Sequence, residues 1–228
     1  YFDEEWLRPG ERLSADPGMH RFVWNLRYER PQAISYDYSI AAVFGEDTPT
    51  AVEGPFVLPG IYSIVLTADG QRYRAPLVVQ LDPRVHTSSA DLRALLTYSQ
   101  SLCAALERAR AAYEGESSAH AALDSLARRL AAQHGDRALL RRVEKLRDAT
   151  AEHGDDGDLG AISGRIGALE ADAESADSAP TSADEDVLQK ESRALDRAVR
   201  AWHDSQSAIR KLNPALRHAG LPAIGVSG

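Results

Sequence analysis

The sequence predicts an α+β protein: a small antiparallel β-sandwich followed by an up-and-down helical bundle. Two observations predict it. Most of the aromatic residues precede residue 86, whereas the remainder of the chain is rich in Ala, Leu and Arg. Aromatic and β-branched residues favour strands, and Ala, Leu and Arg favour helices. We therefore expect a β domain over residues 1–86 and a helical bundle over residues 87–228.

Apolar residues alternate with polar ones in the predicted β domain. Residues 20–28 place apolar or aromatic side chains at every second position, which predicts a strand with Trp24 in the core. Asp69-Gly70 lies between two alternating runs and predicts a hairpin with a type I′ turn. Pro76 in the returning run indicates an edge strand or a bulge. Three or four strands are too few for a comfortable independent core. We therefore expect either that the sandwich is incomplete and lacks strands upstream, or that the helical part covers one of its faces.

Helical spacing of apolar residues begins after residue 87. Ser88 is expected to cap the first helix and Gly115 to end it. A second helix over 119–130 and a third capped by Asp136 are either separate or one kinked helix. A further helix weakened by glycine is expected over 159–169.

The last long helix is predicted to begin at Thr181, which Asp184 follows three residues later. It carries an apolar seam for packing on neighbouring helices, with one residue every seven: Leu188, Leu195, Trp202 and Ile209. Asn213-Pro214 is expected to open a short terminal turn. Short connections favour antiparallel neighbours, which predicts an up-and-down bundle.

Charge and length exclude several classes of function. The 228 residues carry a formal net charge of −8, which argues against a dedicated nucleic-acid binder. No apolar run reaches the roughly 18–20 residues of a membrane-spanning helix. One cysteine excludes an internal disulfide and a multi-cysteine metal site. The chain begins at Tyr1, without an initiator Met or a signal peptide, so we expect a processed or excised piece of a longer protein.

The sequence predicts no catalytic, cofactor-binding or metal-binding residue. The seven histidines are scattered and form no HExxH pair. Cys103 lies on an apolar stripe and is expected to be a small buried hydrophobe. The acidic residues of 154–158 lack the alternating pattern of an EF-hand loop and are expected to be solvated.

Four aromatic residues outside clear strand periodicity are the candidates for contact with a ligand or a partner: Trp6, Tyr36, Tyr38 and Phe56. Flat exposed rings stack on sugars, and they are also common where domains pack together. Packing at an interface is the interpretation that we favour.

Two stretches of the predicted β domain carry a family resemblance: EEWLRPGERLSADPGMHRFVWNLRY and GPFVLPGIYSIVLTADGQRYRAPLVVQLDPRV. They resemble the C-terminal region of bacterial BNR-repeat, sortilin-like "glycosyl hydrolase" proteins, which have large exported β-propellers. The matching positions are Gly18, Arg21, Phe22, Trp24, Leu26, Arg27, Tyr28, Pro59, Gly60, Tyr62, Leu66 and Asp82 to Val85. The segments ESADSAPTSAD and LNPALRHAGLPAI are also similar to the helical tail of that family.

The resemblance implies an immunoglobulin-like module with a helical tail, in a protein exported to the periplasm or the cell exterior. The sequence departs from the family at Asn25, where Asp is usual. The propeller and its hydrolytic residues have no counterpart in this sequence, so the resemblance assigns no catalytic residue to it.

The function expected from the resemblance is a non-catalytic accessory region that supports or docks a propeller or another protein domain. The alternative is a carbohydrate-binding module attached to a glycoside hydrolase, using Trp6, Tyr36 and Tyr38. An active site of its own and helix-mediated oligomerisation are further alternatives. No cofactor, nucleic acid or membrane span is expected.

Overall fold

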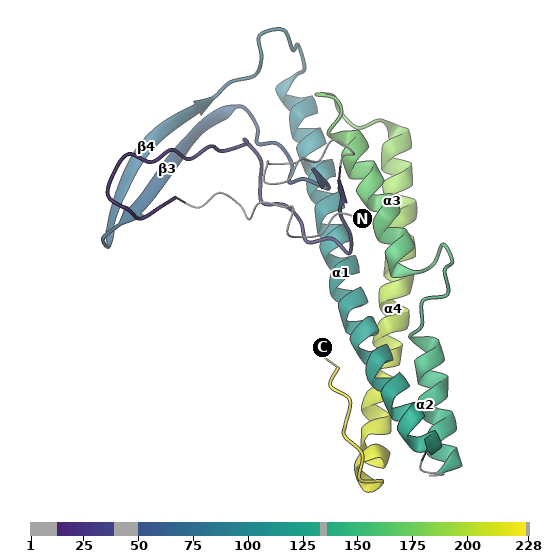
Figure 1. Ribbon diagram of the computed structural model, residues 1–228. Helices are drawn as coiled ribbons and strands as arrows, with labels where there is room; N and C mark the ends of the chain where they lie inside the picture. Colours follow the sequence, from purple (N-terminus) through teal and green to yellow (C-terminus); the bar gives the residue numbers. More distant parts are fainter. Residues whose placement is uncertain (1–12, 39–49, 133–135, 227–228) are drawn as a thin grey trace. The chain divides into compact units, whose positions relative to one another are not determined.

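The computed structural model describes residues 13–38, 50–132 and 136–226, which form four strands and four helices (Figure 1). The predicted α+β class is confirmed. In chain order the elements are β1 (Asp37–Tyr38), β2 (Thr50–Ala51), β3 (Gly60–Ala68), β4 (Gln71–Val79), α1 (Ser89–Ala132), α2 (Arg137–Ala149), α3 (Leu159–Ala173) and α4 (Ser182–His218).

The chain divides into two compact units that interleave along the sequence. Helices α1, α3 and α4 each contribute residues to both units. The β-containing unit comprises Tyr1–Pro31, Tyr36–Cys103 and Leu169–Glu185. The helical unit comprises Gln32–Ser35, Ala104–Ala168 and Asp186–Gly228. The boundary expected between residues 86 and 87 stays a prediction.

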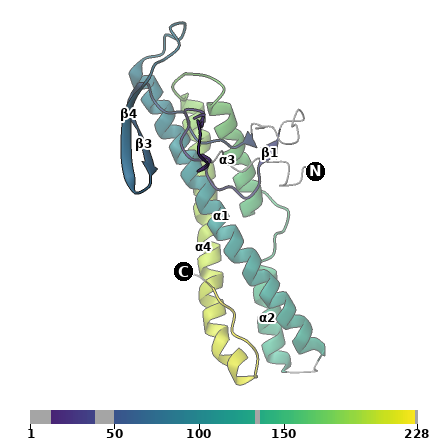
Figure 2. The same cartoon turned by 60° about the vertical axis from the view of Figure 1, so that its left-hand side comes forward.

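The β-containing unit carries a long antiparallel hairpin, β3–β4 (Figure 2). Its turn is Asp69-Gly70, with φ angles of 50° and 76°. Positive φ at both central residues is what a type I′ turn requires, so the predicted hairpin is confirmed. Pro76 lies opposite Ser63 on β4. In this two-stranded sheet both strands are edges, which accommodates a residue without an amide donor.

Both faces of the hairpin expose apolar side chains. Residues directly opposite each other share a face, and Ile61 faces Val78 on one side while Leu66 faces Tyr73 on the other. All four are exposed, Ile61 to 81%. The other described sheet, β1–β2, also has two strands. The immunoglobulin-like sandwich is therefore not confirmed.

The strand expected over residues 20–28 is absent from the structure. Only Arg27 forms a bridge, with Phe56, and Leu26 adopts a φ of 61°, which interrupts an extended chain. Trp24 is half-buried: its ring packs edge-on against Tyr62 with centroids 5.8 Å apart, and its Nε1 donates to the Arg27 carbonyl at 2.9 Å. The expectation that Trp24 is a core residue is wrong.

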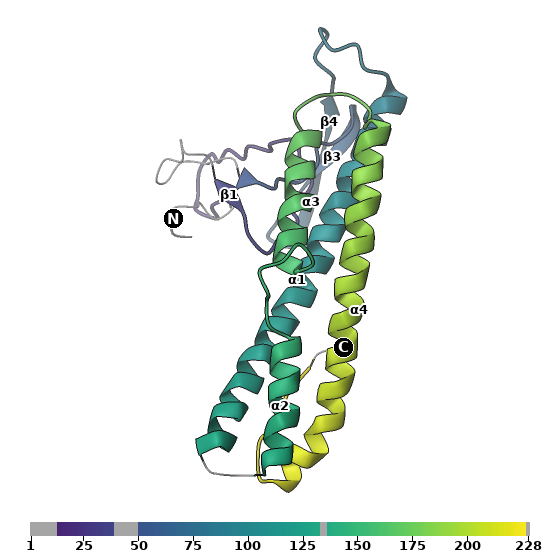
Figure 3. The same cartoon turned by 90° about the vertical axis from the view of Figure 1, so that its right-hand side faces the viewer.

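In the helical unit, α2 and α3 follow one another and run opposite to α1 and α4 (Figures 1 and 3). Ion pairs connect the helices of this unit: Arg108 of α1 contacts Asp196 of α4 at 2.6 Å, and Arg165 of α3 contacts Glu191 of α4 at 2.9 Å. The predicted α4 seam is largely buried, because Leu195, Trp202 and Ile209 are each at most 3% exposed.

Helix α1 continues through Gly115, so the break expected there is wrong. A Cβ atom at this position would lie 2.9 Å from Cζ2 of Trp202. Glycine costs about 1 kcal/mol relative to alanine inside a helix. Here it gives the indole ring of α4 room to lie against α1, and burial of that ring offsets the cost.

The predicted helix caps at Ser88, Asp136 and Thr181 are confirmed. The Ser88 hydroxyl accepts from the Asp91 amide at 3.1 Å before α1. Asp136 accepts from Ala138 and Leu139 at the start of α2, so α2 is separate from the segment 119–130, which belongs to α1. Before α4, the Thr181 amide donates to the carboxylate of Asp184 at 2.7 Å. Each cap satisfies amide groups that the helix leaves without a partner.

Helix α4 also continues through Pro214 to His218, contrary to the expected terminal turn. Leu212 and Leu216, on either side of the proline, are almost fully buried, and their packing offsets the lost backbone hydrogen bond. The Asn213 side chain instead holds the following tail. Its Nδ2 donates to the Ile224 carbonyl at 3.0 Å, and its Oδ1 accepts from the Ile224 amide at 2.8 Å.

Candidate interaction site

A short backbone pairing in the β-containing unit sets Arg27 over the ring of Phe56. The Tyr28 amide donates to the Pro55 carbonyl, and the Val57 amide donates to the Leu26 carbonyl, each at 2.9 Å. The guanidinium carbon of Arg27 then lies 3.6 Å from the centre of the Phe56 ring. An arginine this close to a ring face is attracted by the negative face of the π system.

The same guanidinium group joins two further segments of this unit. Its Nη1 donates to the Gly54 carbonyl at 2.7 Å and to the Glu174 carboxylate at 2.6 Å. The side chains of Arg27 and Glu174 are 16% and 11% exposed, so water screens this ion pair only weakly. Gly54 is required here, because a Cβ atom would lie 2.1 Å from the Tyr28 carbonyl oxygen.

Glu170 lies one helical turn before Glu174 and is 1% exposed. Its Oε1 has no hydrogen-bond partner. Burial, followed by the charge of Glu174, raises the pKa of Glu170 to about 8, although Arg27 opposes the shift. Glu170 is therefore protonated at neutral pH, and a buried neutral acid avoids placing an unpaired negative charge beside that of Glu174. We call Arg27, Phe56, Glu170 and Glu174 the Arg27 cluster.

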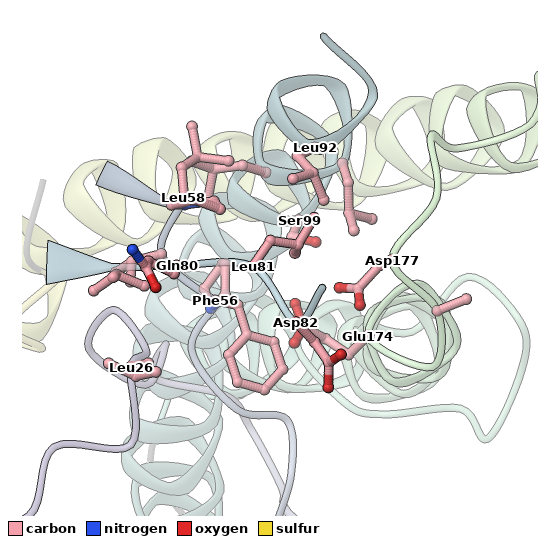
Figure 4. A pocket seen from close by; sticks show the side chains of 17 residues that line it. Leu26, Phe56, Leu58, Gln80, Leu81, Asp82, Leu92, Ser99, Glu174 and Asp177 are labelled. Atoms are coloured by element: carbon pink, nitrogen blue, oxygen red, sulfur yellow. The ribbon is translucent and has the colours of Figure 1, made fainter. Parts of the chain in front are cut away.

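A cavity of about 160 Å³ adjoins the Arg27 cluster within the β-containing unit (Figure 4). We call it the leucine cavity. Its apolar walls include Leu26, Phe56, Leu58, Leu81, Leu92, Leu95 and Leu96, and its polar lining includes Gln80, Asp82, Ser99, Glu174 and Asp177. In Figure 4, Leu58 and Leu92 lie at one end and the carboxylates of Asp82, Glu174 and Asp177 gather at the other. The cavity thus has an apolar end and an acidic end.

Of the two aromatic candidates whose side chains the structure describes, Tyr36 and Phe56, only Phe56 lies at this site. Its ring is about half exposed and carries Arg27 on one face. Tyr36 donates its hydroxyl to the Pro31 carbonyl at 2.9 Å, with the Arg30 guanidinium 6.0 Å from its ring. Trp6 lies outside the described residues, as does the side chain of Tyr38. The role of all four in binding stays a prediction.

Sequence reasoning missed Arg27, Glu170, Glu174 and Ser99. Arg27 and Glu174 are 147 residues apart, and no local spacing signals that they meet. The separation of Glu170 and Glu174 by four residues places two acids on one helical face, where like charges are unfavourable. In the sequence, the spacing of these two acids was a signal that the pKa of one of them is raised.

A second cavity, of about 240 Å³, lies in the helical unit and is lined by Tyr113, Glu116, Ser117, His120, Thr150 and Glu152. Burial, then the charges of Asp158 and Glu152, raise the pKa of Glu116 to about 7. An acid that titrates near neutrality suits proton transfer. The neighbouring Thr150 hydroxyl, however, bonds to the carbonyls of Leu146 and Arg147 at 3.1 Å each, so it serves to end α2.

Among the described residues, no group of three or more His, Cys, Asp or Glu side chains is arranged to hold a metal ion. In the acidic loop, the Asp158 carboxylate instead accepts from the backbone amides of His153, Gly154 and Asp155. Cys103 is only partly buried. In the part of the chain that the structure describes, no helix has the length and apolar character to cross a membrane.

Comparison of the chain with protein-family models, with curated proteins and with solved structures finds no match.

Proposed function

We propose that this chain is a non-catalytic accessory region of a larger exported protein, and that it supports or docks that protein's β-propeller. The observation that carries the proposal is the β3–β4 hairpin, which exposes apolar side chains on both faces. A two-stranded hairpin is marginally stable in water, and soluble monomers rarely leave large contiguous apolar patches uncovered. The hairpin is thus suited to contact with another β domain.

The sequence resemblance to the BNR-repeat, sortilin-like proteins supplies the expected partner and the expected export. In this proposal the hairpin belongs to an immunoglobulin-like module. Further strands or the propeller would cover its faces. The Arg27 cluster supports the proposal as well, because it ties the segment that precedes β3 to Glu174, the residue after α3, through a shielded ion pair.

The test is a binding measurement by calorimetry between this chain and the separately expressed propeller of its parent protein. We expect a complex of one chain with one propeller and no hydrolysis of glycosides by this chain alone. The double variant Ile61→Ser, Val78→Ser removes two facing apolar side chains and should weaken binding about tenfold or more.

Val187→Ser is the matched control, because Val187 is also an exposed apolar residue but belongs to the helical unit. It should leave the affinity unchanged. Absence of binding by a chain that melts cooperatively would contradict the proposal.

Carbohydrate binding is the alternative function, and the observation that supports it is the half-exposed ring of Phe56. Sugar stacking needs an open ring face, and Arg27 covers one face of Phe56. A glycan panel decides between the two functions. Binding to a glycan that Phe56→Ala abolishes would replace the accessory role with a carbohydrate-binding one.

A further inference from the structure

We propose that the leucine cavity binds an alkylammonium group, either a small aliphatic amine or a lysine side chain presented by a protein. The inference concerns the cavity alone and does not depend on the identity of the parent protein. It rests on an unsatisfied buried hydroxyl, on the charge of the lining and on the arrangement of its apolar and acidic ends.

The hydroxyl belongs to Ser99 on α1. Ser99 is 1% exposed and lines the cavity, yet its Oγ has no hydrogen-bond partner. Leaving a buried polar group unpaired is unfavourable, because the group gives up its hydrogen bonds to water and gains none in the protein. A donor or acceptor that enters the cavity would supply a hydrogen bond, so the cavity is built for an occupant with a polar group.

The charge of the lining selects a cation. Of the described residues that line the cavity, three are acidic and none is basic. Glu174 is paired with Arg27, and Asp82 with Arg84. The carboxylate of Asp177 has no hydrogen bond or ion pair with any residue that the structure describes, which leaves it free to accept from a ligand.

The size and shape of the cavity favour an aliphatic stem on that cation. A cavity of about 160 Å³ is close to the size that holds a benzene ring. Its leucine end would bury methylene groups, while an ammonium group at the acidic end donates to Asp177 and to the Ser99 hydroxyl (Figure 4). An ammonium has three donors and is compact, which suits two acceptors on neighbouring walls.

The test is a calorimetric titration of the full chain with n-hexylamine, n-hexanol and hexanoate at neutral pH. We expect the amine to bind about tenfold more tightly than the alcohol, and the carboxylate to bind weakest, since a hydrogen bond to a charged group adds about 1.5–3 kcal/mol. Equal affinities for the three probes would show that the cavity has no preference for a cation, and no binding at all would show that it holds only water. Either result would overturn the proposal.

Two variants make the test specific. Asp177→Asn removes an exposed carboxylate and should reduce the affinity for the amine to that for the alcohol. Ser99→Met should fill the cavity and weaken all binding. Asp204→Asn changes an exposed acid of the helical unit and is the matched control, with no expected effect. If Asp177→Asn leaves the preference for the amine intact, the assignment of the acidic end is wrong.

A second probe distinguishes the two sources of the ammonium group. A lysine residue with blocked amino and carboxyl ends carries the same stem and head, attached to a peptide backbone. If it binds as n-hexylamine does, a protein side chain can occupy the cavity. If only the free amine binds, the occupant is a small molecule.

Discussion

The two compact units differ in how far they bury their apolar side chains. In the helical unit the largest apolar residues are almost fully buried, among them Leu123, Ile162 and Ile166. In the β-containing unit the strands of the hairpin expose apolar side chains on both faces. The helical unit therefore completes its own core, whereas the β-containing unit offers surface for another domain to cover.

The largest expected difference between the two units is in the free energy of unfolding lost when Trp202 or Trp24 is replaced by alanine. Trp202→Ala should lower the free energy of unfolding of the helical unit by about 3–5 kcal/mol, because the indole is buried against Gly115. Trp24→Ala should cost only about 1–2 kcal/mol, because that ring is half-buried and packs edge-on against Tyr62. Urea denaturation followed by circular dichroism measures both. Equal losses would contradict the contrast between the units.

Arg27→Met should be more damaging to the β-containing unit than Trp24→Ala, at about 2–3 kcal/mol. It leaves the Glu174 carboxylate without its cationic partner and the Gly54 carbonyl without its donor. It should also raise the pKa of Glu170 further, because Arg27 lowers it in the native protein. Thermal unfolding measures the loss of stability. Arg84→Met, which breaks an exposed ion pair, is the control and should leave the thermal unfolding nearly unchanged.

Glu170→Gln should remove a pH dependence that belongs to the β-containing unit. The pKa of Glu170 rises from 4.5 to about 8 on folding, so its contribution to stability is complete below pH 4.5 and is lost as the pH increases toward 8. In that range the unfolded chain releases a proton that the folded chain retains. The amide cannot ionise, so the variant should gain about 2–4 kcal/mol over the native chain at alkaline pH.

The helical unit provides the parallel case for this pH dependence. The pKa of Glu116 is raised to about 7, so Glu116→Gln should also stabilise the chain at alkaline pH, by less than Glu170→Gln does. Melting temperatures over a pH series compare the two variants. A Glu170→Gln variant that keeps the native slope between pH 5 and pH 8 would show that this carboxyl group ionises normally.

The smallest effect on stability is expected from the hairpin surface. Ile61→Thr should change the free energy of unfolding by about 0.5 kcal/mol or less, because the side chain is largely exposed. It should nevertheless reduce the binding of a hydrophobic dye to the folded chain, since the residue belongs to an exposed apolar face. Dye fluorescence that is unchanged in this variant would indicate that the apolar surface lies elsewhere.

Local signals in the sequence predicted much of the fold. Asp69-Gly70 predicted the hairpin, and Asp136 and Thr181 predicted the starts of α2 and α4, because turns and caps depend on neighbouring residues. The failures were positions at which packing outweighs a local preference. Gly115 was expected to end a helix, yet it accommodates the Trp202 ring, and α4 continues through Pro214 because buried leucines flank it.

The candidate site was less accessible to prediction. Phe56 was selected as an aromatic residue outside strand periodicity, and it does line the leucine cavity. Its partners were not foreseeable, because Leu26 adopts a positive φ and the alternation of residues 20–28 gave no reason to expect one. The meeting of Arg27 with Glu174 depends on the tertiary fold, on which local spacing carries no information.

The two hydrogen bonds between the Asn213 side chain and the backbone of Ile224 have a practical consequence for work with the protein. The amide side chain of Asn213 both donates to and accepts from one backbone residue, as a neighbouring β-strand would, and so holds the tail against the end of α4. Leu221 and Ile224 of this tail are buried. Shortening the chain to residue 218 would remove these two hydrogen bonds. It would also expose to water the surface that Leu221 and Ile224 now cover. Affinity tags are better joined after the tail than substituted for it.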